Sequence, residues 1–184
     1  MQKQPVKSCG IVIEEIPLSG CYVINFPKNS DERGSFFRKY CKNCFLDKEL
    51  NTHWTQTNFS SNLVKGTLRG FHFQREPFQE IKLVSCVSGE VMDVILDLRP
   101  SSETYLKTFS INLSAELNTS IYIAKGVAHA YLSLQDNSAV MYQVSEDYTP
   151  EKSAGVNFSD PKIDVVWPIE PRLISIADRT WPPL

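Results

Sequence analysis

Short strand-like segments follow one another from residue 53 to residue 144, and their spacing constrains the fold more than any other feature of the chain. Turn signals such as Pro100–Ser102 and Lys125–Gly126 separate the segments. The expected strands are 53–58, 66–74, 81–87, 91–98, 105–113, 120–123, 128–134 and 139–144. Many short strands at such spacing predict a β-sandwich or barrel. We therefore expect an all-β fold, a barrel of the jelly-roll type.

The two ends of the chain show weaker patterns. Strands expected at 11–16 and 22–26 form either an extra sheet or an arm that pairs with another subunit, and helical signal is limited to 42–51 and to a turn at 175–179. The length of 184 residues fits one domain. Within it we expect N-terminal strands and an arm at 1–52, a barrel core at 53–148, and a C-terminal tail covering the barrel at 149–184.

Charge and hydropathy exclude several classes of protein. Nineteen Lys and Arg against twenty-one Asp and Glu give a net charge of -2, which is too little positive charge for nucleic acid to be the main partner. No apolar run is long enough to span a membrane, and the first ten residues lack the apolar stretch of a secretory signal. We expect a soluble cytoplasmic protein without a nucleic-acid or membrane partner.

The segment 91–98 carries two carboxylates on one face and apolar residues on the other. Asp93 and Asp97 alternate with Met92, Val94 and Leu96. Strand alternation by itself favours a solvated outer face for the two carboxylates. If that face instead lines the mouth of a barrel, Asp93 becomes a site residue.

Three histidines are candidates for acid–base chemistry. His53 begins a strand and is expected to be structural or exposed, and His129 lies within a later strand. His72 shares its strand with Arg69, three positions earlier, so the two side chains point to opposite faces of a regular strand. Only a bulge or twist at Gly70 would bring them together.

Metal and thiol chemistry find little support. The segment His72–Gln74 has one imidazole where a His-x-His pair would be needed, and too few other ligands converge for a transition metal. Cys41 and Cys44 have CxxC spacing, but there is no second pair for zinc and no βαβ context for a redox site. A barrel of this kind is expected to work by acid–base chemistry without a metal.

Several motifs occur in order over most of the chain. They are 31–37, 66–74, 82–84, 89–99, 113–116, 126–129, 147–151, 160–161, 164–168 and the tail around Asp178. From about residue 21 to the C-terminus these motifs resemble the dTDP-4-dehydrorhamnose 3,5-epimerase family of nucleotide-sugar epimerases. The resemblance implies a cupin-type jelly roll, a homodimer with exchanged N-terminal strands, a 4-keto-6-deoxy nucleotide-diphosphate sugar as substrate, and no metal or organic cofactor.

The resemblance also implies roles for residues that carry little signal alone. Tyr142 would ordinarily be a core or interface tyrosine, and Asp178 a carboxylate in a helical turn. By resemblance, His72 is the catalytic base, Asp178 pairs with it, and Tyr142 is the general acid on the opposite face of the sugar. Arg69 and Lys82 are the cations around the 4-keto oxygen.

A second group of residues is similar to the family's substrate contacts. By resemblance the nucleotide and diphosphate contacts are Arg33, Phe36, Gln56, Asn58 and Tyr148, and His129 is a further pocket residue. Asp93 joins the candidate substrate-binding residues through the strand argument given above.

Three departures from the family pattern leave alternatives open. They are Arg38, Gln143 and the longer segment 58–65, and all lie near the nucleotide, the pocket or its rim. They leave CDP open beside dTDP, and they leave open whether carbon 3, carbon 5 or both are inverted. The expected activity is an epimerase of deoxysugar biosynthesis, for a surface polysaccharide or a glycosylated natural product. The alternatives are a non-catalytic nucleotide-sugar binding protein and a 3,4-ketoisomerase.

Overall fold

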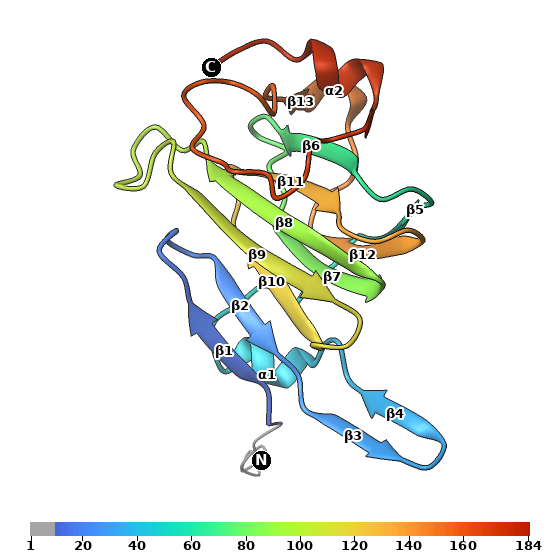
Figure 1. Cartoon of the computed structure of the whole chain (residues 1–184). Helices are drawn as coiled ribbons and strands as arrows, with labels where there is room; N and C mark the ends of the chain where they lie inside the picture. The colour runs from blue at the N-terminus through green and yellow to red at the C-terminus, as the bar shows by residue number, and fades with distance from the viewer. Residues whose placement is uncertain (1–9) are drawn as a thin grey trace.

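The computed structural model describes residues 10–184, so the first nine residues, including most of the segment used above to argue against a secretory signal, lie outside it. Two β-sheets of six strands each form the body of the molecule (Figure 1). The first sheet contains, in spatial order, β1 (Val12–Glu15), β2 (Tyr22–Asn25), β10 (Thr119–Ile123), β7 (Lys82–Ser88), β12 (Ser138–Val144) and β5 (Gln56–Asn62). The second contains β13 (Ser153–Gly155), β6 (Thr67–Gln74), β11 (Val127–Ser133), β8 (Glu90–Asp97) and β9 (Thr108–Ser114), with β14 (Leu173–Ile174) beside β6.

Smaller elements lie at the two ends of the molecule. The hairpin of β3 (Lys28–Asp31) and β4 (Gly34–Phe37) forms a separate two-stranded sheet that projects from the body, and α1 (Lys42–Leu46) follows it (Figure 1). The C-terminal segment, with the one-turn 3-10 helix Pro150–Lys152 and α2 (Ile176–Thr180), lies at the opposite end (Figure 1). Among the residues described, no helix is long and apolar enough to cross a membrane.

An apolar cluster drawn from both sheets packs between them. Val84 of β7, Ile121 of β10 and Val140 of β12 meet Ile95 of β8 and Leu113 of β9, and all five are fully buried. Burial of alternate residues from two facing sheets is the usual core of a jelly roll. The expectation of an all-β jelly roll is therefore confirmed.

The strand β8 is buried on both faces, which corrects the prediction for its two carboxylates. Asp93 and Asp97 are 0% exposed and share their face with the core residue Ile95, so they point into the barrel. The apolar face, with Val94, points outward and packs in one cluster with Val156 of the C-terminal segment. The prediction of a solvated carboxylate face was wrong because the C-terminal segment covers the outer face of the second sheet.

Buried carboxylates need partners, and the two aspartates find them differently. Asp97 accepts hydrogen bonds from the Arg99 guanidinium at 2.8 and 2.6 Å and from the hydroxyls of Ser102 and Thr104, both at 2.7 Å. Asp93 bonds to the ring of His129. Asp97 is therefore part of a closed structural network, whereas Asp93 is connected to the region of the cavity described below.

Most expected strands are present with shifted ends. The strand expected at 53–58 begins at Gln56, the one expected at 105–113 begins at Thr108, and the helix expected at 42–51 ends at Leu46. In the N-terminal region, β1 and β2 extend the first sheet of the same chain, with β2 beside β10. Cys41 carries a free thiol, so the CxxC segment does not close on itself as a disulfide.

Candidate active site

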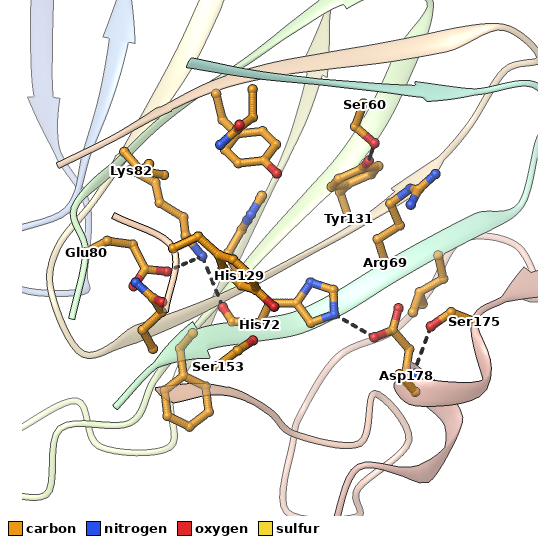
Figure 2. Close-up of a pocket in the computed structure, with 18 of the residues that line it drawn as sticks. Ser60, Arg69, His72, Glu80, Lys82, His129, Tyr131, Ser153, Ser175 and Asp178 are labelled. Carbon is orange, nitrogen blue, oxygen red and sulfur yellow. Dashed lines mark hydrogen bonds and ion pairs between the residues drawn. The ribbon is translucent and has the colours of Figure 1, made fainter. Parts of the chain in front are cut away.

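A cavity of about 900 Å³ opens between the two sheets at the end covered by the C-terminal segment. Its walls come from β5, β7 and β12 of the first sheet, from β6 and β11 of the second, and from residues 173–181 (Figure 2). Elements far apart in the sequence therefore contribute to one site. A cavity of this size lined by several convergent polar groups is the default location for small-molecule chemistry.

One wall carries a histidine bonded to a buried carboxylate. Nε2 of His72 lies 2.6 Å from Oδ1 of Asp178, whose residue is only 3% exposed (Figure 2). The indole of Trp181 donates to the same oxygen at 3.2 Å, and the Asp178 amide donates to the Ser175 hydroxyl at 3.0 Å. Burial raises the pKa of Asp178, but the hydrogen bond and charge of His72 outweigh it, so the pKa lies below its ordinary value. Asp178 is thus held as a carboxylate that orients the imidazole.

A bulge in β6 brings Arg69 and His72 into the same cavity. His129 of β11 is opposite His72, but Tyr131 is opposite Arg69, so β6 has one more residue than β11 between the two pairs. Gly70 occupies the bulge with a φ of 121°, and an added Cβ would lie 2.6 Å from backbone and side-chain atoms of Ala130. Both the conformation and the space require glycine here. The sequence predicted that only a bulge or twist at Gly70 could bring Arg69 and His72 together, and the structure has this bulge.

The facing sheet supplies a buried ammonium group. Lys82 is 7% exposed, and its Nζ lies 2.9 Å from Oε1 of Glu80 and donates to the carbonyl oxygen of His72 at 3.2 Å (Figure 2). Glu80 also lines the cavity, and sequence reasoning missed it. The only available signal was its position two residues before Lys82, which puts both on one side of an extended segment.

A tyrosine reaches the cavity from β12, on the first sheet. Tyr142 is opposite Val84 of β7 and Asn58 of β5. Burial raises the pKa of Tyr142, and the charge of Tyr131 acts in the same direction. The hydroxyl therefore keeps its proton at neutral pH. Because His72 belongs to the second sheet, the imidazole and this phenol enter the cavity from opposite walls.

A short polar network extends the site beyond the predicted residues. The Tyr131 hydroxyl lies 2.7 Å from the Ser60 hydroxyl, and Nε of Arg69 donates to the Asn62 side-chain oxygen at 2.9 Å. Tyr131 and Ser60 line the cavity and were not predicted. Alternation in their strands alone does not separate them from ordinary core residues.

Four of the predicted substrate contacts also line the cavity, namely Gln56, Asn58, His129 and Tyr148. Asp93 lies behind this wall: it is fully buried, and its Oδ2 is 2.8 Å from Nε2 of His129. It is placed to orient His129 rather than to touch a ligand. Among residues 10–184 no group of three or more His, Cys, Asp or Glu side chains is arranged to hold a metal ion.

Two predicted nucleotide contacts lie apart from the cavity of their own chain. Arg33 and Phe36 belong to the projecting β3–β4 hairpin (Figure 1), and neither is among the residues that line the cavity. Phe36 is 70% exposed, and Arg33 forms an exposed ion pair with Asp31. The structure of one chain therefore separates these residues from the other predicted contacts.

Comparison with known proteins identifies the family. A family model described as dTDP-4-dehydrorhamnose 3,5-epimerase matches residues 15–184. The chain belongs to this family. It is 39% identical to the dTDP-4-dehydrorhamnose 3,5-epimerase of Methanothermobacter thermautotrophicus over 170 residues, which cover 91% of each protein. The resemblance inferred from the motifs is confirmed.

Solved structures of the epimerase family share the fold. The dTDP-4-dehydrorhamnose 3,5-epimerase of Bacillus anthracis, solved with TDP and PPi bound, is similar with a TM-score of 0.92 and 30% identity, over 95% of this chain and 100% of that one. ChmJ, a 3'-monoepimerase from Streptomyces bikiniensis solved with dTDP-quinovose, has a TM-score of 0.87 and 30% identity, over 92% of this chain and 86% of that one. The predicted cupin-type fold of the epimerase family is confirmed.

Proposed function

We propose that this chain epimerises a dTDP-linked 4-keto-6-deoxy sugar in deoxysugar biosynthesis, as an isomerase that needs no cofactor. The observation that carries the proposal is the placement of His72, bonded to Asp178, and Tyr142 on opposite walls of one cavity. Inversion of a carbon centre requires a proton to leave one face and another to arrive on the opposite face. A base and an acid that face each other across the substrate provide this.

Proton removal falls to His72. Its Nε2 is bonded to Asp178, which leaves Nδ1 to accept the proton from a carbon next to the ketone. The electron pair of the broken C–H bond moves into the enolate, and negative charge develops on the keto oxygen. Lys82 and Arg69 line the same cavity and supply positive charge for that oxygen. Fixed charges and dipoles of this kind are commonly the largest contribution to catalysis.

Proton return falls to Tyr142. Its raised pKa keeps the hydroxyl protonated until the enolate forms. Transfer of the phenolic proton to the carbon on the face away from His72 then completes the inversion. The same pair of groups can act on either carbon next to the ketone, so the chemistry permits inversion at carbon 3, carbon 5 or both.

The relatives favour dTDP as the nucleotide and leave the inverted carbon as a quantity to be measured. The Bacillus anthracis epimerase holds TDP, and ChmJ holds dTDP-quinovose. One of these proteins is named a 3,5-epimerase and the other a 3'-monoepimerase. CDP therefore becomes the comparison substrate for this chain.

The direct test is proton NMR of the purified protein in deuterium oxide with dTDP- and CDP-linked 4-keto-6-deoxyglucose. We expect deuterium to enter the sugar next to the ketone with the dTDP substrate, and the labelled positions identify the carbons inverted. Tight binding without exchange at either carbon would contradict the proposal and favour a nucleotide-sugar binding protein. Movement of the keto group to carbon 3 would favour the ketoisomerase.

We further propose a homodimer in which N-terminal strands are exchanged. Arg33 and Phe36 lie on a hairpin that projects from the chain and are remote from its own cavity, which supports a role at the cavity of a second copy. In this proposal residues 1–52 contain the exchanged arm, residues 53–148 form the barrel and residues 149–184 cover it, all within one domain. The first nine residues of the arm lie outside the described part.

Subunit mixing tests the exchange. We expect Arg33→Ala and His72→Ala proteins to be weakly active or inactive alone, and to regain up to about a quarter of wild-type activity per subunit after denaturation and refolding together. One site of each mixed dimer then combines an intact His72 with an intact Arg33 from the other chain. No recovery, in a preparation whose light scattering shows dimers, would contradict the contribution of Arg33 across subunits.

A further inference from the structure

Glu80 is a carboxylate in the cavity for which the mechanism above has no role. Its side chain is only 8% exposed, and Oε1 bonds to the Lys82 ammonium at 2.9 Å (Figure 2). Its second oxygen, Oε2, is buried and has no hydrogen-bond partner within the described part of the chain. A buried carboxylate oxygen without a partner costs free energy, so such a group in a site calls for an explanation.

The ammonium of Lys82 has two fixed acceptors. Oε1 of Glu80 takes one, and the carbonyl oxygen of His72 takes a second at 3.2 Å. A protonated lysine has three N–H donors, so one donor is left for a ligand in the cavity. Lysine also has a flexible four-carbon stem. One acceptor lies on β6 and the other on the segment just before β7, and together they restrict that flexibility and set the direction of the third N–H bond.

The two acceptors connect this ammonium to the base. The carbonyl oxygen that receives its hydrogen bond belongs to His72 itself, on the second sheet, whereas Lys82 lies on the first. On β12, Val144 is opposite Lys82 and Tyr142 is opposite Val84, so Lys82 and Tyr142 are diagonal neighbours on one face. The ammonium is therefore bonded to the backbone of the predicted base and belongs to a residue beside the predicted acid, so it is well placed to reach the keto oxygen of a sugar held by both.

We propose that Glu80 is a positioning residue, which holds the Lys82 ammonium so that its remaining N–H donor points at the keto oxygen of the sugar. Glu80 then acts on the reaction through Lys82 and does not touch the substrate. The inference rests on the epimerase function proposed above and deepens it.

A purely structural role would not require this arrangement. A buried ion pair often adds little stability compared with apolar side chains of similar size, because desolvation offsets the attraction between the charges. A carboxylate, however, also attracts an ammonium through its charge, which a neutral acceptor of the same shape does not. The gain from Glu80 is therefore in the geometry of Lys82.

The test compares Glu80→Gln, Lys82→Met and the double variant with the wild-type protein, using deuterium exchange of dTDP-4-keto-6-deoxyglucose. Glutamine keeps the size of Glu80 and an acceptor oxygen but removes the charge. For Glu80→Gln we expect kcat to fall about tenfold with KM changed less than about twofold, since the position of the Lys82 ammonium matters most in the transition state. In the Lys82→Met background, Glu80→Gln should cause no further loss, because it acts through a group already removed.

Glu90→Gln is the matched control. Glu90 lies on β8, bonds to the Asn112 amide at 3.1 Å, and does not line the cavity, so its kcat should equal that of the wild type. Thermal unfolding of each variant followed by circular dichroism establishes that the assays measure folded protein.

Each other outcome overturns the inference in a recognisable way. Unchanged or increased kcat in folded Glu80→Gln would show that Glu80 does not assist Lys82. A further loss in the Lys82→Met background would show that Glu80 acts on the substrate directly. If the wild-type protein itself gives no exchange, the proposed function fails, and this role fails with it.

Discussion

His72→Ala is expected to stop proton exchange at every carbon of the sugar, with kcat lowered about 10³-fold or more. Asp178 cannot take over as the base, because its residue is only 3% exposed and its carboxylate lies behind the imidazole, bonded to Nε2 of the ring. Removal of the imidazole leaves a buried carboxylate and no base at the position of His72. Of the other basic groups that line the cavity, His129 and Glu80 are bonded to Asp93 and Lys82. Deuterium exchange of dTDP-4-keto-6-deoxyglucose measures the loss.

The affinity of His72→Ala for dTDP shows whether the variant has lost only its base or has lost the structure of the binding site. In the proposed mechanism His72 contributes to proton transfer and not to nucleotide binding, so the dissociation constant for dTDP, measured by calorimetry, should change less than about threefold. Equal losses of dTDP binding and of exchange would contradict the assignment of His72 as base. His72→Asn is the matched variant, since it restores a polar group of similar size without a basic nitrogen.

The alternation of apolar and polar residues predicted the fold well, because each strand buries one row of side chains against the opposite sheet. The segments that became β7, β8 and β12 all place Val, Ile or Leu against the opposite sheet. Alternation could not tell which side of a strand is covered. Asp93 and Asp97 were placed on the wrong side because the covering residues, such as Val156, come from the far end of the chain.

The sequence predicted some residues of the site and missed others. Motif order located His72, Tyr142 and Lys82, which the fold brings to one cavity. It did not locate Glu80, whose proposed role depends on a contact with Lys82 that spacing only suggests. Arg33 was predicted as a nucleotide contact by resemblance, together with an N-terminal arm exchanged between subunits. The structure of one chain leaves Arg33 outside its own cavity, so both predictions depend on a second copy.

The bulge at Gly70 shows how a small local feature decides the site. A regular β6 would point Arg69 and His72 to opposite faces, and one of them would lie outside the cavity. The extra residue turns both inward, and only glycine fits between the strand and Ala130. The sequence indicated that Arg69 and His72 could meet only if β6 had a bulge at Gly70, but whether the bulge forms depends on how the sheet packs.

Tyr142→Phe is expected to separate the two halves of the reaction. His72 and Lys82 remain, so proton abstraction and deuterium exchange at the original face should continue at a rate within about tenfold of wild type. Formation of the inverted sugar should fall about 10²-fold to 10³-fold, because the variant lacks the proposed proton donor on the opposite wall. The phenyl ring keeps the packing of Tyr142 against its neighbours, so the change removes the hydroxyl with little loss of shape.

The ratio of exchange to inversion is therefore the quantity to measure, by proton NMR of substrate and product in the same sample. In the wild-type protein the two rates should be similar, and in Tyr142→Phe exchange should exceed inversion by at least about tenfold. Tyr131→Phe is the matched control: its hydroxyl also reaches the cavity, but it is bonded to Ser60 at 2.7 Å, so it should leave the ratio near the wild-type value. If Tyr131→Phe changed the ratio and Tyr142→Phe did not, the proton returned to the sugar would come from Tyr131. Because Tyr131 belongs to the same sheet as His72, that result would also contradict the proposal that base and acid enter from opposite walls.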